Sequence, residues 1–183
     1  MQYAHNAFGL EGVKGLGASL FMRGSPFLNA AWNGDLDYIK NDLKIIFRTE
    51  NINENYDLDI VTERKPDSIQ LADLKFAWNL CLFIKSNSII LVKNQTLLGM
   101  GAGQPNRVMS VKIAGEVAGK KSNGSILASD AFFPFTDSVI KADDLGVKCI
   151  IQPGGSINDK DVINEANKRG IVMIFTNQRR FTH

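Results

Sequence analysis

Apolar residues follow two alternating patterns along residues 66–183 of this chain. Short continuous apolar runs are typical of strands inside a covered sheet, and longer stretches with an apolar residue every three or four positions are typical of helices. The expected strands are Ser88–Lys93, Thr96–Met100, Ile126–Ser129, Val147–Gln152 and Ile171–Phe175, and the expected helices are Ile69–Ile84, Asn106–Lys121, Phe135–Leu145 and Asp159–Arg169. Their alternation predicts an α/β layer fold.

Local signals mark the ends of these elements. Ser68 is a suitable N-cap for the first helix, because its hydroxyl can accept a hydrogen bond from the first turn. The turn-forming pair Asn94-Gln95 joins the first two strands. Gly146 and Gly170 are expected to stop the last two helices, since glycine readily takes the left-handed conformation that ends a helix.

Residues 1–65 are less regular, and the sequence predicts a domain boundary at the break Arg64-Lys65-Pro66. Leu43–Thr49 has the pattern of a short strand, and Leu58–Thr62 that of an extended connection. Two interpretations of residues 1–65 stay open, namely part of the same domain or the remnant of a preceding unit. Residues 66–183 form the predicted α/β unit.

Composition excludes several classes of protein. The net charge is +2, and the Lys and Arg residues are dispersed, which argues against a nucleic-acid-binding surface. No run of 18 apolar residues and no signal-peptide pattern occurs, so we expect a soluble protein that is not exported and binds no membrane. Cys81 and Cys149 each lie within an apolar run, which predicts buried free thiols and fits a reducing cytoplasm.

Ligands of α/β sheets bind where strands end and loops begin. The loops in question are Gly101–Arg107, Ser129–Asp137, Gln152–Ile157 and Thr176–His183. In the first loop, Gly-Ala-Gly-Gln leads to Arg107 at the start of a helix, a suitable arrangement for an anion such as a phosphate. The alternative is a tight strand-to-helix turn whose Arg107 side chain is solvated.

The other loops also carry distinctive residues. The segment SDAFFPFTD places Phe132, Phe133 and Phe135 beside Asp137. These rings are either core residues or the wall of a slot for a flat heteroaromatic ring, whose N–H groups a carboxylate would bind. In QPGGSIND, two glycines and Ser156 precede a helix and offer backbone amides. The chain ends on Arg179, Arg180, Phe181, Thr182 and His183.

Together these motifs, KSNS with GAGQxxR, SDAFFPFxD, QPGGS and a terminal Arg-x-Phe-x-His, resemble the final portion of the transformylase region of a bifunctional purine-biosynthesis enzyme. That enzyme joins aminoimidazole carboxamide ribonucleotide (AICAR) formyltransferase to inosine monophosphate (IMP) cyclohydrolase. The resemblance runs from about Leu58 to His183, and the first fifty or so residues match poorly. It implies a three-layer α/β/α, cytidine-deaminase-like fold with a mixed sheet. The zinc-deaminase signature is absent, since the only histidines are His5 and His183, so no metal site is expected.

The resemblance also implies a role for individual residues. Asn87 corresponds to the catalytic asparagine that contacts the reacting part of the substrate. The residues that correspond to AICAR-binding positions are Arg107, Phe132 and Arg179. Val108, Asp137, Ser156 and Ile157 correspond to folate-contacting positions, and Pro134 and Phe135 line the same pocket. The implied reaction is formyl transfer from the co-substrate 10-formyltetrahydrofolate to the 5-amino group of AICAR.

One part of the family's machinery is missing from the sequence. The family assigns proton removal to a Lys-His pair in its first transformylase unit, and no Lys-His dipeptide occurs here. The cyclohydrolase domain is absent as well, so no cyclization is expected. The sequence therefore predicts a half-site subunit that needs another transformylase chain, or self-association, for activity. The alternative is a non-catalytic nucleotide- or folate-binding remnant of the enzyme.

Overall fold

A mixed six-stranded sheet forms the centre of the computed structural model, which describes residues 57–180. Its strands are β1 (Asp59–Ile60), β2 (Ile89–Lys93), β3 (Thr96–Gly101), β4 (Ile126–Ser129), β5 (Cys149–Gln152) and β6 (Val172–Phe175). They lie in the order β1-β6-β5-β4-β2-β3. β4, β5 and β6 are parallel, whereas β2 is antiparallel to both of its neighbours and β1 is antiparallel to β6. One edge of the sheet therefore collects the carboxyl ends of β3 to β6 and the amino end of β2.

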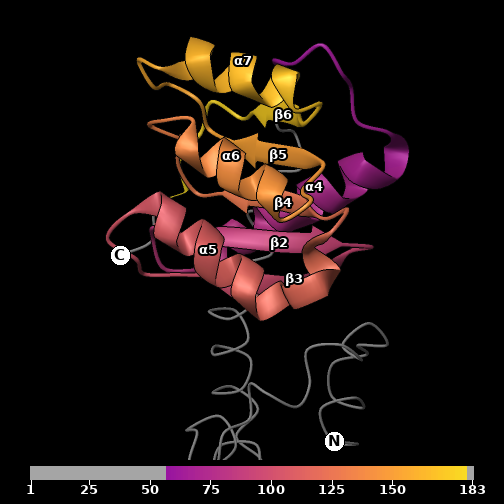
Figure 1. Cartoon of the computed structure of the whole chain (residues 1–183), viewed down its shortest axis with the longest axis vertical. Coiled ribbons are helices and arrows are strands. Elements are labelled where there is room, and N and C mark those ends of the chain that lie inside the picture. The colour runs from indigo at the N-terminus through magenta and orange to yellow at the C-terminus, as the bar shows by residue number, and fades with distance from the viewer. Residues whose placement is uncertain (1–56, 181–183) are drawn as a thin grey trace, which may run out of the picture. The chain divides into compact units, whose positions relative to one another are not determined.

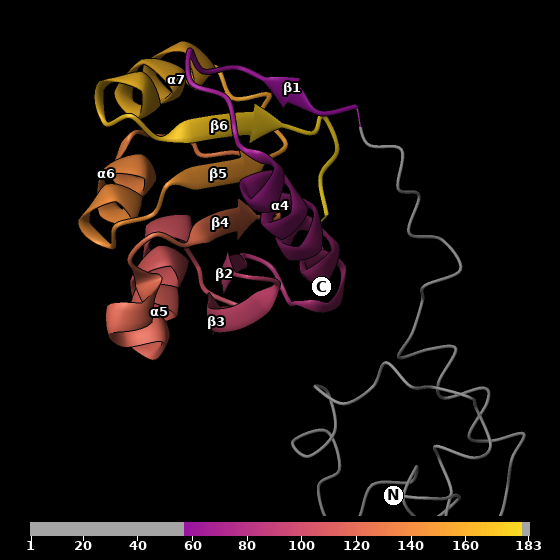
Figure 2. The same cartoon turned by 90° about the vertical axis from the view of Figure 1, so that its right-hand side faces the viewer.

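Helices cover both faces of this sheet. They are α4 (Ser68–Leu80), α5 (Arg107–Ala118), α6 (Asp137–Asp144) and α7 (Asp159–Lys168). α5, α6 and α7 lie side by side on one face, and α4 lies on the other (Figures 1 and 2). Neighbouring strand residues face opposite layers, since Ile89 belongs to the core under α5–α7 and Ile90 to the core under α4. The expected three-layer α/β arrangement is confirmed.

The first helix begins one residue earlier than the sequence predicted. Asp67, not Ser68, is the N-cap of α4, and its carboxylate accepts a 2.7 Å hydrogen bond from the backbone N–H of Gln70. The Gln70 side chain accepts in return from the Asp67 N–H, which completes a capping box. Ser68 could cap a helix alone, but Gln70 is spaced to reciprocate only with Asp67.

Other element boundaries differ from the prediction by a turn or less. The first helix gives way to a 3₁₀ turn at Cys81–Phe83, and α5 gives way to another at Gly119–Ser122. α6 begins at Asp137 instead of Phe135, with an acidic residue in its first turn where the helix dipole favours one. Gly146 and Gly170 follow α6 and α7 with φ of 77° and 64°, as the two stop signals predict.

The hairpin between β2 and β3 is tied to α4 by a buried carboxylate. Asn94 and Gln95 both have φ of 51°, the left-handed conformation that a two-residue hairpin turn requires. Asp73 of α4 accepts hydrogen bonds from both turn amides, at 2.8 Å from Asn94 and 2.6 Å from Gln95. The Asp73 carboxylate thus joins the helix to the sheet.

The folded unit begins before residue 66, where the sequence placed the domain boundary. β1 pairs with β6, and the Thr62 hydroxyl accepts a 2.9 Å hydrogen bond from the backbone N–H of Met173. Two residues of the predicted extended connection Leu58–Thr62, Asp59 and Ile60, therefore form an edge strand of the same sheet. The predicted strand Leu43–Thr49 lies outside the described residues, as do His5 and His183. Across residues 57–180 no helix has the length and apolar character needed to cross a membrane.

Candidate functional site

The loops named by the sequence meet at the carboxyl edge of the sheet, as predicted. Asn87 comes just before β2, and Arg107 is the first residue of α5, reached from β3. The loops after β4 and β5 and the segment after β6 begin at the same edge, because these three strands are parallel and in register. The register pairs Ile89 of β2 with both Gly101 and Ser129, which aligns the remaining strand ends.

The side chain of Arg107 is the centre of a buried hydrogen-bond network. One terminal nitrogen, Nη1, donates to the Asp130 carboxylate and, at 2.8 Å, to the Ser129 hydroxyl. The other, Nη2, donates to Asn87 Oδ1 at 2.7 Å. The Arg107 and Asp130 side chains are 7% and 0% exposed. The alternative of a solvated arginine after the glycine loop is therefore wrong.

The amide of Asn87 is held in one orientation by this network. Its Oδ1 accepts from Arg107, and its Nδ2 donates to the Gln104 carbonyl at 2.9 Å. The Asn87 backbone carbonyl accepts a 2.9 Å hydrogen bond from the Ser110 hydroxyl. An amide NH₂ group has two N–H donors, so one N–H of Asn87 remains for a ligand, with its direction already fixed.

The glycines before Arg107 have separate roles. A Cβ on Gly101 would lie 2.1 Å from the Ser110 carbonyl oxygen, so Gly101 is needed for packing β3 against α5. Gly103 has φ of 66° and donates its N–H to the Lys85 carbonyl at 2.9 Å. The sequence predicted that the glycines let a ligand approach the backbone of this loop. In the structure, both glycines make close contacts with the protein itself, and these contacts position the loop that joins β3 to Arg107.

The phenylalanines after β4 divide between core and surface, so the core interpretation is confirmed for one of them and the ring-binding slot stays a prediction for the other two. Phe133 is fully buried, and its N–H donates to Gln152 Oε1 at 2.7 Å. The ring of Phe132 is half-buried, with the Arg179 guanidinium carbon 4.6 Å from its centroid. Phe135 is 63% exposed. Only Phe133 is a core residue, and the other two rings are accessible to a ligand.

The predicted folate-contacting residues come mainly from two linked loops. Asn158 Nδ2 donates to the Pro134 carbonyl at 2.7 Å, which joins the loop after β4 to the loop after β5. Ser156 in that second loop accepts a 3.2 Å hydrogen bond from the Asn158 N–H, and Ile157 beside it is 98% exposed.

Two other predicted folate residues stand apart from the Arg107 network. Asp137 heads α6, is exposed, and accepts a 2.7 Å hydrogen bond from the Ser138 N–H. Val108 lies in the first turn of α5 and is partly exposed. Within residues 57–180, no hydrogen bond joins the Asp137 carboxylate to Asn87, and the Val108 side chain has no hydrogen-bonding group. Their place in the site therefore stays a prediction.

Sequence reasoning missed the buried partners of the predicted residues. Asp130 and Ser129 bind Arg107, Ser110 binds Asn87, and Arg180 packs against Trp78. Asp130 lies inside the SDAFFPFTD segment, but its pairing with Arg107 spans 23 residues of sequence. The sequence did offer one signal for these partners, namely the polar pair Ser129-Asp130 at the end of a buried strand.

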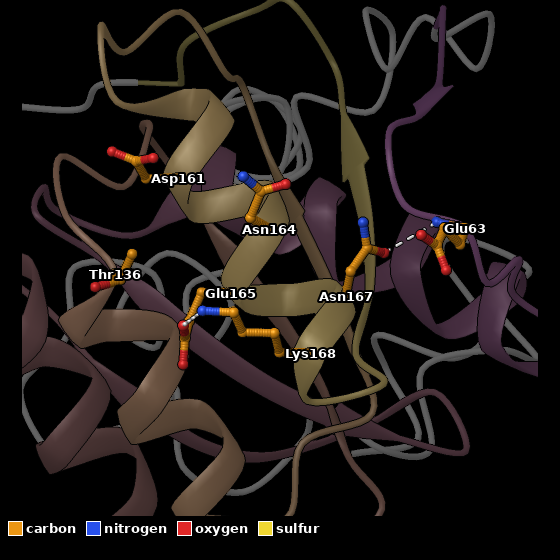
Figure 3. Close-up of a pocket in the computed structure, with 7 residues that line it drawn as sticks. All are labelled: Glu63, Thr136, Asp161, Asn164, Glu165, Asn167 and Lys168. Carbon is orange, nitrogen blue, oxygen red and sulfur yellow. Dashed lines mark hydrogen bonds and ion pairs between the residues drawn. The ribbon is translucent and has the colours of Figure 1, made fainter.

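One hollow on the described surface lies away from the Arg107 network. A hollow of about 700 Å³ follows α7, and none of the predicted site residues lines it. Figure 3 shows its lining side chains on and beside α7: Glu63, Thr136, Asp161, Asn164, Glu165, Asn167 and Lys168. Glu165 forms an ion pair with Arg169, and the hydrogen bond from Arg169 lowers the pKa of Glu165, so this carboxylate already has a partner within the protein. The hollow is lined by polar and charged residues with no aromatic or aliphatic residue among them, so the Arg107 network is the better site.

The cysteines are not candidate nucleophiles. Both are free and buried. Burial raises the pKa of the Cys81 thiol far above its usual range and raises the pKa of Cys149 to about 12, so neither forms a thiolate at neutral pH. Over residues 57–180, no three His, Cys, Asp or Glu side chains gather as metal ligands.

Known proteins match part of this chain. The family model described as "AICARFT/IMPCHase bienzyme" matches residues 30–117. The bifunctional purine biosynthesis protein purH of Dictyostelium discoideum is 54% identical over 124 residues, which cover 68% of this chain and 23% of that protein. The PurH proteins of Nostoc punctiforme and Synechocystis sp. are 55% and 56% identical over 124 residues.

The matched part of this chain belongs to the AICARFT/IMPCHase bienzyme family. The resemblance to this family is thereby confirmed, whereas its restriction to the final portion of the transformylase region stays a prediction. The chain spans about a quarter of the length of the curated relatives it matches. The family model begins at residue 30, so the family match extends further toward the amino terminus than Leu58, where the motif resemblance began.

Solved structures give only a distant likeness. Acinetobacter baumannii RibD aligns with a TM-score of 0.40 and 17% identity, over 57% of this chain and 34% of RibD. That TM-score is too low to assign the sheet to a particular fold family. The cytidine-deaminase-like topology therefore stays a prediction, and the mixed α/β sheet itself is what the structure shows.

Proposed function

We propose that this chain forms the substrate-contacting half of an AICAR transformylase site, acting in the cytoplasm with 10-formyltetrahydrofolate as formyl donor. The observation that carries the proposal is the direct Arg107–Asn87 hydrogen bond. It joins a predicted substrate-binding residue to the residue predicted to contact the reacting group. The 54% identity to a bifunctional purine biosynthesis protein supports the same reaction.

The two arginines suit different parts of the nucleotide. Asp130 neutralises Arg107, so the remaining N–H donors of Arg107 suit an uncharged acceptor such as the carboxamide oxygen. Arg179 is exposed and forms no ion pair with residues 57–180, so its full charge is available to the phosphate. Phe132, beneath the Arg179 guanidinium, offers a ring face to the imidazole.

The folate co-substrate fits the outer loops. Phe135 and Ile157 are apolar side chains left on the surface by loops that the Asn158–Pro134 hydrogen bond holds together. A pterin ring could cover such side chains, while the backbone amides near Ser156 bind its polar edge. The exposed Asp137 carboxylate is available to accept from the ring N–H groups.

The chemistry asked of these residues is orientation and charge stabilisation. The 5-amino group of AICAR is a poor nucleophile, because its lone pair is delocalised into the imidazole and carboxamide. Asn87 has one N–H left to donate to the carboxamide or to the oxygen that gains charge on the formyl carbon. Asn87 cannot remove the proton, because an amide is not a base at neutral pH. We therefore assign the base to another transformylase unit that carries the Lys-His pair.

Calorimetric titration of AICAR into the 183-residue chain tests the binding part of the proposal. We expect saturable binding, and Arg179→Ala should weaken it about 10–100-fold, because a charge-assisted hydrogen bond contributes about 1.5–3 kcal/mol. Arg64→Ala is the matched control, since exposed Arg64 donates to the Gly170 carbonyl before β6, at the opposite edge of the sheet. Absent binding, or equal affinity in Arg179→Ala and the native chain, would contradict the proposal.

The second candidate is a non-catalytic nucleotide- or folate-binding remnant. It is favoured by one observation, the absence of a Lys-His dipeptide from the sequence. Binding alone does not separate it from a half-site subunit, because both retain the Arg107 network. Turnover in the presence of a partner separates them.

A further inference from the structure

Two adjacent arginines at the end of the described chain have opposite environments. Arg179 is exposed over Phe132, whereas Arg180 is 9% exposed. The Arg180 guanidinium carbon lies 4.4 Å from the centroid of the Trp78 ring, and Nη1 donates to the Trp78 carbonyl at 2.6 Å. Arg180 thus connects the segment after β6 to α4, 102 residues earlier in the chain.

Backbone hydrogen bonds lead this segment across the site edge. The N–H groups of Thr176 and Asn177 donate to the carbonyls of Gln152 and Pro153, each at 3.0 Å. The Arg180 N–H then donates to the Asp130 carbonyl at 2.9 Å. Figure 2 shows the segment, in yellow, leaving the end of β6 and running past β5 toward α4. It therefore crosses the carboxyl ends of β5 and β4 in turn.

The contact between Arg180 and Trp78 is strong enough to hold the segment after β6 in place. A guanidinium over a tryptophan face is among the stronger cation–π arrangements when it is shielded from water. Trp78 is itself fully buried in the core under α4, so the ring is a rigid platform. Residues 176–179 belong to no helix or strand, and beyond the backbone hydrogen bonds of Thr176 and Asn177 their position depends on such end contacts.

We propose that Arg180 is a positioning residue, which docks the carboxyl-terminal segment on Trp78 and thereby holds Arg179 over Phe132. The same contact places the Arg180 backbone N–H on the backbone carbonyl of Asp130, the residue whose side-chain carboxylate binds Arg107. The effect on substrate rests on the proposed function, because it assumes that Arg179 binds the AICAR phosphate. The docking itself does not depend on that assumption.

Amide hydrogen exchange of the full chain tests the docking without any ligand. In Arg180→Met, the amides of residues 176–180 should exchange at least about tenfold faster than in the native chain, with the β4 and β5 amides unchanged. Arg180→Lys keeps a cation and one donor group, so it should retain part of the protection. Arg180→Gln, which keeps a donor without the charge, replaces the methionine variant if that variant fails to fold. Unchanged protection in the methionine or glutamine variant would overturn the docking.

A double-mutant cycle on AICAR affinity tests the positioning role. Arg180→Met should weaken AICAR binding about tenfold by displacing Arg179, with partial rescue in Arg180→Lys. In an Arg179→Ala background the same change should have almost no further effect, since the residue it positions is gone. Additive losses would mean a merely structural role and would overturn the inference. If the native chain binds no AICAR, the proposed function fails, and hydrogen exchange still decides whether Arg180 docks the segment.

Discussion

Replacing Arg107 by methionine is expected to lower the free energy of unfolding by about 3–5 kcal/mol. The reason is the Asp130 carboxylate, which is fully buried and takes its charge partner from Arg107. Without the guanidinium, Asp130 keeps a buried charge with nothing to offset its lost hydration. Ser129 and Asn87 lose a donor in the same change. Urea denaturation of the native and variant chains measures the loss.

The matched control removes the stranded charge as well. The double variant Arg107→Met/Asp130→Asn should recover most of the lost stability, because the neutral amide is far easier to bury than an unpaired carboxylate. Arg107→Lys should fall between the native chain and Arg107→Met, since an ammonium keeps the charge but lacks the planar fork. A loss below about 1 kcal/mol in Arg107→Met, or no recovery in the double variant, would show that the ion pair is not the reason for the stability of this edge.

Replacing Asn87 by alanine is expected to lower transformylase turnover about 10²–10³-fold in a complex that supplies the Lys-His pair. The structure fixes the Asn87 amide through Arg107 and the Gln104 carbonyl, so its remaining N–H is aimed before substrate arrives. Such a preorganised donor stabilises the oxyanion without reorganisation during the reaction. Initial rates at saturating AICAR and 10-formyltetrahydrofolate measure the effect.

Asn87→Asp separates donation to substrate from support of Arg107. An aspartate keeps an oxygen for the Arg107 hydrogen bond but has no N–H to donate. If the N–H acts on the substrate, the aspartate variant should be as slow as the alanine variant. An aspartate variant with near-native turnover would mean that Asn87 acts only by holding Arg107, and would contradict its assignment as a catalytic residue.

The fold could be predicted from the sequence to the extent that single elements carry their own signals. β4 coincides with the predicted strand Ile126–Ser129, because a four-residue apolar run between polar turns has few other ways to be buried. The start of α4 was placed one residue late, since Asp67 and Ser68 are both good caps and only the reciprocal bond from Gln70 decides between them.

The site was predictable as a set of loops, but its internal contacts were not. Strands that run in the same direction bring their carboxyl ends to one edge, which is why Arg107 after β3 could be expected near the loop after β4. Asn87 reaches the same edge because β2 runs antiparallel to β4. The pairing of Arg107 with Asp130, and of Arg180 with Trp78, depends on how the layers pack. Nothing within a few residues of Arg107 shows that Asp130 neutralises it, and nothing near Arg180 shows that it docks on Trp78. The prediction from sequence therefore gave Arg107 a free charge and gave Arg180 no role.

Turnover measured in trans tests the half-site most directly. The native chain is assayed with AICAR and 10-formyltetrahydrofolate, alone and together with a PurH relative that keeps its Lys-His pair but has lost its counterparts of Asn87 and Arg107. We predict no turnover from either protein alone and formylated AICAR from the mixture, because only the mixture holds a complete set of groups. Robust turnover by the native chain alone, or an inactive mixture in which AICAR nevertheless binds this chain, would contradict the half-site account.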